Sequence, residues 1–68
     1  MMITIKTEYL DTVRRILKAQ FNRAECKATD NITLVLAFDS DVLYREVALW
    51  LSDAFGCQLI VSYEVARD

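Results

Sequence analysis

Hydrophobic residues alternate with polar ones at the start of the chain and then change to a helical spacing. Ile3 and Ile5 are each followed by a polar residue, which is typical of a strand with one buried face. From residue 7 to residue 21 hydrophobic side chains recur every three or four positions, which predicts a helix with Thr7 as its N-terminal cap. The predicted apolar stripe of this helix comprises Tyr9, Leu10, Val13, Ile16, Leu17 and Phe21.

Two short alternating segments follow. Residues 24–29 alternate small apolar side chains with polar ones and predict a thin strand. Residues 32–38 alternate larger side chains and predict a stronger strand, with Ile32, Leu34, Leu36 and Phe38 on its buried face.

The length of the loop between these two strands can be predicted from the side chains that must share the buried face. A two-residue turn at residues 30–31 would place Lys27 opposite Leu34 on the core side. A three-residue loop over residues 29–31 pairs Cys26 with Leu34 and keeps the apolar side chains on one face, so we expect that loop.

A second helix and a last strand complete the pattern. Ser40 or Asp39 is the expected N-cap of the helix, and Gly56 is expected to end it in the position just beyond the C-cap. The apolar stripe of this helix comprises Leu43, Tyr44, Val47, Trp50, Leu51, Ala54 and Phe55. Residues 57–65 alternate again and predict a strand. Its expected core-facing residues are Cys57, Leu59, Val61, Tyr63 and Val65.

This order of elements, strand–helix–strand–strand–helix–strand, predicts an α+β fold of the split βαβ, or ferredoxin-like, type over residues 1–68. Both helices should lie on one face of a four-stranded antiparallel sheet. Right-handed crossovers place the first and third strands in chain order at the centre of the sheet.

Composition narrows the chemistry. The 68 residues are 54% hydrophobic and include one glycine, no proline and no histidine. We therefore expect a single small domain. Its small core should give a low free energy of unfolding, which self-association would increase. The absence of histidine removes the common nucleophile–base pairs and histidine metal ligands. Cys26 and Cys57 lie far apart without a CxxC spacing, so neither a zinc site nor a thioredoxin-like motif is expected, and both thiols are predicted to be buried.

The carboxylates do not form a catalytic pair. Asp39 and Asp41 are explained as partners of the second helix's N-terminus. Glu46 and Asp53 lie seven residues apart, roughly 10 Å along a helix axis, which is too far to share a metal or a proton. We expect no catalytic residue, no cofactor, no metal and no enzymatic activity.

The chain carries no signal of export or membrane insertion. Its N-terminus alternates in hydropathy instead of forming the apolar core of a signal peptide, and no long apolar run follows. We expect a cytoplasmic protein with no membrane contact.

A nucleic-acid contact is an alternative function. Its candidate residues, on or just after the first helix, are Arg14, Arg15, Lys18 and Arg23. Asp11 lies within one turn of Arg15 and weakens this basic strip. The net charge of −2 and the lack of aromatics on the open sheet face, where RNA-recognition modules stack bases, make nucleic-acid binding the less favoured interpretation.

The favoured interpretation is a non-enzymatic protein-interaction module. Val42 and Leu49 project from the outer side of the second helix beside Arg45, like a small hydrophobic centre with a charged rim. A second candidate surface is the apolar centre of the open sheet face, formed by Met2, Val35 and Ile60. Such a module could be an adaptor, an inhibitor of the kind phages and plasmids encode, or a homodimerising unit. A regulatory domain that senses a small ligand is a further alternative.

Overall fold

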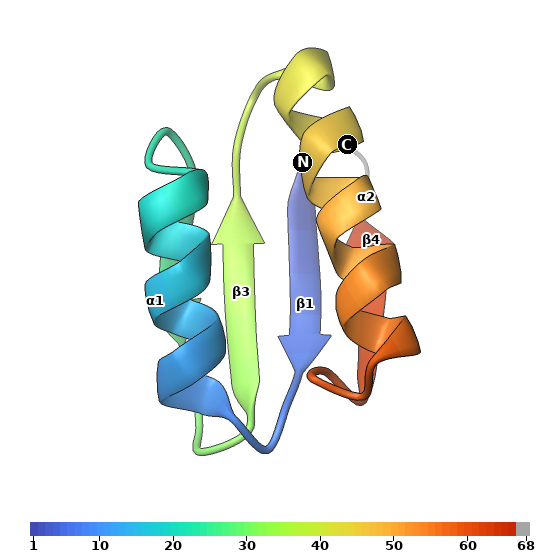
Figure 1. The fold of residues 1–68 in the computed structure, drawn as a ribbon. Helices are drawn as coiled ribbons and strands as arrows, with labels where there is room; N and C mark the ends of the chain where they lie inside the picture. The colour runs from blue at the N-terminus through green and yellow to red at the C-terminus, as the bar shows by residue number, and fades with distance from the viewer. Residues whose placement is uncertain (67–68) are drawn as a thin grey trace.

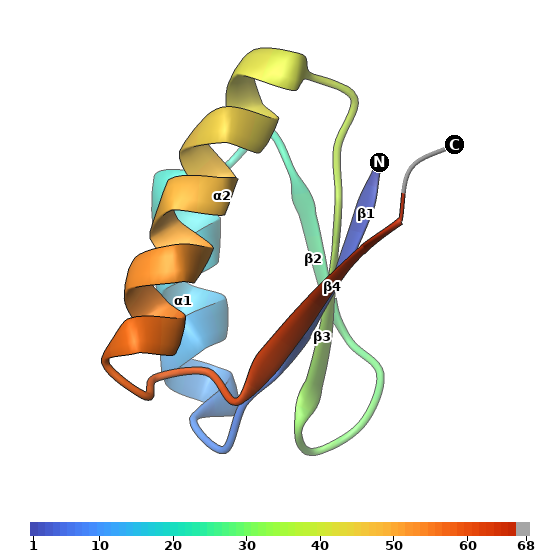
Figure 2. The same cartoon turned by 90° about the vertical axis from the view of Figure 1, so that its right-hand side faces the viewer.

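Two helices cover one face of a four-stranded antiparallel sheet in the computed structural model, which describes residues 1–66 (Figures 1 and 2). The elements in chain order are β1 (Met2–Lys6), α1 (Leu10–Gln20), β2 (Glu25–Ala28), β3 (Thr33–Ala37), α2 (Asp41–Gly56) and β4 (Ser62–Ala66). The strands lie in the order β2-β3-β1-β4, with β1 and β3 at the centre. The predicted ferredoxin-like α+β class is confirmed.

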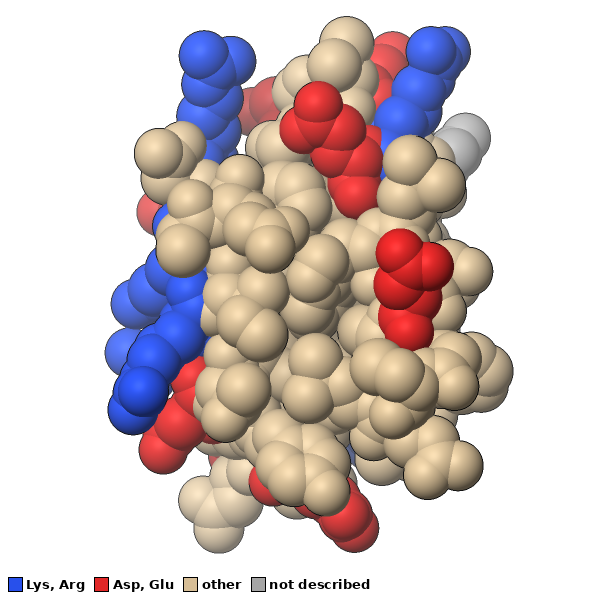
Figure 3. All heavy atoms as spheres, viewed as in Figure 1, with Lys and Arg blue, Asp and Glu red and all other residues tan. Residues whose placement is uncertain are grey.

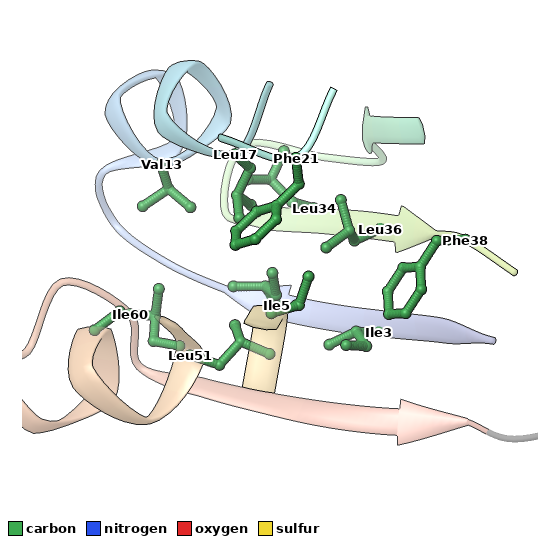
Figure 4. Packing of buried hydrophobic residues seen from close by; sticks show 12 residues of the cluster. Ile3, Ile5, Val13, Leu17, Phe21, Leu34, Leu36, Phe38, Leu51 and Ile60 are labelled. Carbon is green, nitrogen blue, oxygen red and sulfur yellow. The ribbon is translucent and has the colours of Figure 1, made fainter. Parts of the chain in front are cut away.

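The hydrophobic core lies between the sheet and the helices (Figure 4). Alternation along β1 and β3 turns Ile3, Ile5, Leu34 and Leu36 toward the helices, where all four are fully buried. The helices bury one stripe each against them, comprising Val13 and Leu17 of α1 and Val47, Leu51 and Ala54 of α2. Trp50 is half-buried and packs at the edge of this core.

The β2–β3 pair differs from the prediction by two residues in register. Cys26 lies opposite Leu36, not Leu34. The three-residue loop covers residues 30–32, because Thr29 donates its N–H to the carbonyl oxygen of Thr33 (3.0 Å). The carboxylate of Asp30 accepts the Ile32 N–H (2.9 Å) and holds the turn, which removes Ile32 from the ladder and leaves it exposed. A two-residue shift preserves both strand faces, so the predicted faces remain correct.

Thr7 connects three loops instead of capping α1 directly. Its hydroxyl accepts the Tyr9 N–H (2.9 Å) and donates to the Leu59 carbonyl oxygen (2.7 Å). Its own N–H donates to the carbonyl oxygen of Ile32 (2.8 Å). The helix begins at Leu10, with Tyr9 as an N-cap that makes no side-chain bond. Thr7 is buried, and its hydrogen bonds connect the C-terminal end of β1 with the β2–β3 loop and the α2–β4 loop.

The N-terminus of α2 agrees with the prediction, whereas its C-terminus does not. Ser40, one of the two predicted candidates, is the N-cap, and its hydroxyl accepts the Leu43 N–H (3.2 Å). Gly56 does not take the predicted position after the C-cap, because it still belongs to the helix. That position is occupied by Gln58, whose φ of 66° is in the left-handed region.

This C-terminus of α2 has the hydrogen bonds of a Schellman motif. Gln58 donates its N–H to the carbonyl oxygen of Phe55 (3.2 Å), and Leu59 donates to that of Ala54 (2.9 Å).

The prediction of a strand over residues 57–65 is wrong in its first five residues. The Schellman motif reverses the chain there, and β4 begins only at Ser62. As a result Ile60, expected on the open face, is 2% exposed and lies in the same cluster as Leu51 (Figure 4). Cys57, expected in the core, is the exposed C-cap of α2, and Val61 is exposed as well.

Candidate functional site

The outer side of α2 carries two strongly exposed hydrophobic residues. Val42 is 68% exposed and Leu49 is 70% exposed, the two largest values among the large hydrophobic residues of the described chain. Because α2 buries Val47 and Leu51 on its opposite side, the helical period turns Val42, Leu49 and the exposed Arg45 away from the core. The structure thus brings these three predicted residues to one surface, which we call the α2 strip.

Charged residues border the α2 strip. Asp41, Glu46 and Asp53 are exposed on the same helix, so carboxylates outnumber Arg45 around the strip. Figure 3 shows this helical face of the molecule, with acidic side chains over α2, cationic ones along the α1 edge and a broad uncharged area between them. The strip is therefore an apolar centre with a mainly acidic border.

An open hollow of about 950 Å³ lies where α1 ends and α2 begins. Its hydrophobic lining residues include Met1, Phe21, Phe38 and Leu43, which are buried or half-buried. Its exposed charged residues are Arg23, Glu25, Asp39 and Glu46. Val42 and Glu46 also line the hollow, so it continues the α2 strip around the end of the molecule.

The basic strip predicted on the first helix forms only in part. Arg14, Arg15 and Lys18 line one shallow hollow of about 350 Å³, together with Asp11. Arg23 instead lines the hollow at the start of α2. The structure thus brings together three of the four predicted nucleic-acid contacts and places a carboxylate among them.

The cations of α1 also act on a neighbouring thiol. Burial raises the pKa of Cys26 on β2, and the nearby Lys18 and Arg14 partly oppose that rise. Since α1 packs against β2, this helix and its cations lie at the β2 side of the sheet.

The second predicted contact surface, the apolar centre of the open sheet face, is not formed. Ile60 is buried, Val35 is half-buried, and Met2 remains exposed at the end of β1. On the open side Lys27 lies opposite Val35 in the sheet register, and Thr4 lies between Val35 and Glu64. The cross-strand neighbours of Val35 are therefore polar, and the apolar pair Met2 and Ala37 lies nearer one end of this face.

The sequence did not point to a third apolar surface. Phe55, Tyr63 and Val65 were all predicted to face the core, but each is exposed. The rings of Phe55 and Tyr63 make an edge-to-face contact with centroids 6.4 Å apart. No sequence signal distinguishes these residues from core positions, since all three continue the apolar pattern of their predicted elements.

The described part of the chain holds no group of three His, Cys, Asp or Glu side chains arranged to bind a metal ion. None of the helices within residues 1–66 is long and apolar enough to cross a membrane.

Comparisons with known proteins identify no relative: no family model matches the chain, and no curated protein or solved structure is significantly similar to it.

Proposed function

We propose that this protein is a non-enzymatic protein-interaction module that presents the α2 strip to a partner protein. The single observation that carries the proposal is the pair Val42 and Leu49, the most exposed large hydrophobic residues of the described chain, aligned on one side of α2. Burying such side chains against a partner removes apolar surface from water, which is the main driving force of protein association.

The border of the strip specifies the chemistry of the partner. Asp41, Glu46 and Asp53 contribute three carboxylates against the single cation Arg45. Complementary charge favours a partner with an apolar contact surface bordered by lysine or arginine side chains. Binding should weaken as salt is added, because salt screens exposed charge pairs.

The hollow beside the strip extends the surface available to a partner. Its hydrophobic lining includes Phe21, Phe38 and Leu43, and Val42 belongs to both the strip and the hollow. A partner helix or loop that covers Val42 could therefore place one side chain into the hollow. A role as an adaptor or as an inhibitor of a larger assembly fits such a surface, since both act by occupying a partner.

The test is a double substitution, Val42→Glu with Leu49→Glu. Wild-type and variant chains are used to capture proteins from the host lysate, and the recovered partner is then titrated against each purified chain. We expect at least a tenfold loss of affinity in the variant. Circular dichroism should show an intact fold, because surface substitutions usually change stability by no more than about 0.5 kcal/mol.

A matched control is available on the other helix. Thr12 and Ala19 are also exposed and also seven residues apart, on α1. The double change Thr12→Glu with Ala19→Glu adds the same charge and should leave partner binding unchanged. Equal affinity of the wild-type and the α2 variant for the partner would refute the proposal.

A further inference from the structure

β4 is an edge strand that the helices cover only in part. In the sheet register Tyr63 and Val65 lie opposite Ile5 and Ile3 of β1. The two β1 residues are fully buried, whereas Tyr63 is 37% exposed and Val65 is 38% exposed. Figure 2 shows the reason: α2 and β4 are closest at their connecting loop and diverge toward the C-terminal end of β4.

The backbone of β4 also has a free hydrogen-bonding edge. Thr7 donates to Ile32, and Phe38 donates to Met1, so the odd-numbered residues of β1 face β3. In an antiparallel sheet the direction alternates, and the even-numbered residues of β1 therefore face β4. Their partners in β4 are even-numbered too, since Thr4 lies opposite Glu64. The N–H and C=O groups of Tyr63 and Val65 consequently point away from the sheet.

We propose that β4 pairs antiparallel with β4 of a second copy of this chain, joining the two sheets across a two-fold axis. The two-fold axis can pass through Glu64 or through Tyr63, near the middle of β4. Both registers keep the helices of the two copies on the same face of the joined sheet. An axis at Glu64 places two carboxylates directly opposite each other, with Cα atoms about 4.5 Å apart, which is destabilising. An axis at Tyr63 avoids this contact, and we assign that register.

The Tyr63 register is self-complementary. Tyr63 faces its own copy, Glu64 faces Ser62, and Val65 faces the exposed Val61 just before the strand. The outward N–H and C=O groups of Tyr63 then bond to those of its copy, as an antiparallel ladder requires. Val61 adds no donor to this ladder, because its N–H is already donated to the Lys6 carbonyl oxygen (2.7 Å). The pairing also covers the apolar surface that Phe55 and Tyr63 form.

The opposite edge of the sheet is unsuited to the same pairing. β2 packs beside α1, the helix that carries Arg14, Arg15 and Lys18. Two β2 edges would bring two such helices together, and like charges at an interface oppose association. The described strand β4 carries no cation and one carboxylate, Glu64. The charge pattern therefore selects β4 as the self-pairing edge.

The first test measures mass by light scattering at tens of micromolar. Wild-type protein should have twice the 7.8 kDa of one chain. Val65→Pro should be monomeric, because proline removes an outward N–H that the bonds to β1 do not use. Ala28→Pro is the matched control at the β2 edge and should remain dimeric. A monomeric wild-type chain, a dimeric Val65→Pro variant or an assembly larger than a dimer would overturn the proposal.

The second test identifies the register and does not depend on the proline variants. In a background with Cys26→Ser and Cys57→Ser, Tyr63→Cys should form a disulfide-linked dimer on oxidation, since paired Cα atoms lie about 5.5 Å apart. A mixture of Ser62→Cys and Ala66→Cys chains, which keeps Glu64, should not crosslink, because these two residues face each other only with the axis at Glu64. Crosslinking of that mixture, or none from Tyr63→Cys, would contradict the Tyr63 register.

Discussion

At the scale of single residues, Gln58 has the least expected conformation. It is the only residue with a positive φ within residues 1–66, and glutamine rarely adopts that region because its Cβ crowds the following carbonyl. The only glycine, two positions earlier, lies in the last turn of α2, where its freedom is not needed. Glutamine would thus suit the helical position 56 better, and glycine would suit the left-handed position 58 better.

Replacing Gly56 by a better helix former and Gln58 by glycine should each stabilise the protein. We expect Gly56→Ala to raise the free energy of unfolding by about 0.4–1 kcal/mol, because it restricts the unfolded chain and the added Cβ meets nothing within 4 Å. Gln58→Gly should add about 0.5 kcal/mol by relieving the left-handed strain. Urea unfolding measures both, with Gln58→Val as a destabilised control. A loss of stability in Gly56→Ala would show that residue 56 does not have helical φ in solution.

The two thiols should differ in reactivity. Cys57 is exposed, and its thiol makes one weak contact, 3.5 Å from the Ala54 carbonyl oxygen, so it should react with a thiol reagent almost as fast as in the unfolded chain. Cys26 is half-buried and should react more slowly. The variants Cys26→Ser and Cys57→Ser isolate each thiol for a stopped-flow measurement. Equal rates in the native state would contradict the placement of Cys57.

The pH dependence of Cys26 follows from the same burial. Burial raises its folded-state pKa above the ordinary value of 9.0. The buried thiol therefore contributes fully to stability below that pH, and the contribution is lost as the pH rises through the folded-state value. Cys26→Ser should accordingly show less alkaline destabilisation than Cys57→Ser.

At the scale of elements, the connections are held by hydrogen bonds between loops that are distant in sequence. Thr7 bonds to Leu59 and Ile32, and Lys6 accepts the Val61 N–H (2.7 Å). These bonds fix where α1 and β4 begin. They also explain why the predicted boundaries of those two elements were less accurate than those of β1 and α2.

Removing the Thr7 hydroxyl should therefore cost more than a surface change. Thr7→Val keeps the shape of the side chain but leaves the Leu59 carbonyl and the Tyr9 N–H without this partner. We expect a loss of about 1–3 kcal/mol in the free energy of unfolding, measured in urea. Thr7→Ser keeps the hydroxyl and should lose only about 0.8 kcal/mol for the missing methyl group. A Thr7→Val variant as stable as Thr7→Ser would exclude this role.

At the scale of the whole molecule, charge is divided between the two helices. The cations Arg14, Arg15 and Lys18 gather on α1 with Asp11 among them, whereas α2 is mainly acidic. With a net charge of −2 for the whole chain, this division offers a polyanion only a small cationic surface.

Binding to nucleic acid should accordingly be weak. We expect a dissociation constant of about 10⁻⁴ M or weaker at physiological salt, measured by fluorescence anisotropy with labelled single- and double-stranded oligonucleotides. Arg14→Ala with Lys18→Ala is the control pair and should change the signal little. Submicromolar binding that this pair abolishes would instead support the nucleic-acid alternative.

The sequence by itself determined the fold class, the buried faces of β1 and β3, the buried faces of both helices apart from Tyr9 and Phe55, and the exposure of Val42 and Leu49. These features depend on local periodicity, because a strand alternates every two residues and a helix repeats every 3.6. A two-residue error in the β2–β3 register left the faces unchanged for the same reason.

Only the tertiary structure decided the backbone path of residues 57–65 and which of their side chains are buried. Ile60 and Val61 exchanged their predicted sides because a left-handed Gln58 reversed the chain, and periodicity carries no signal for such a reversal. The exposure of Tyr63 and Val65 depends on how α2 diverges from β4, a packing angle set by contacts between distant segments. The proposed edge interface was therefore invisible in the sequence, whereas the α2 strip could be predicted from it.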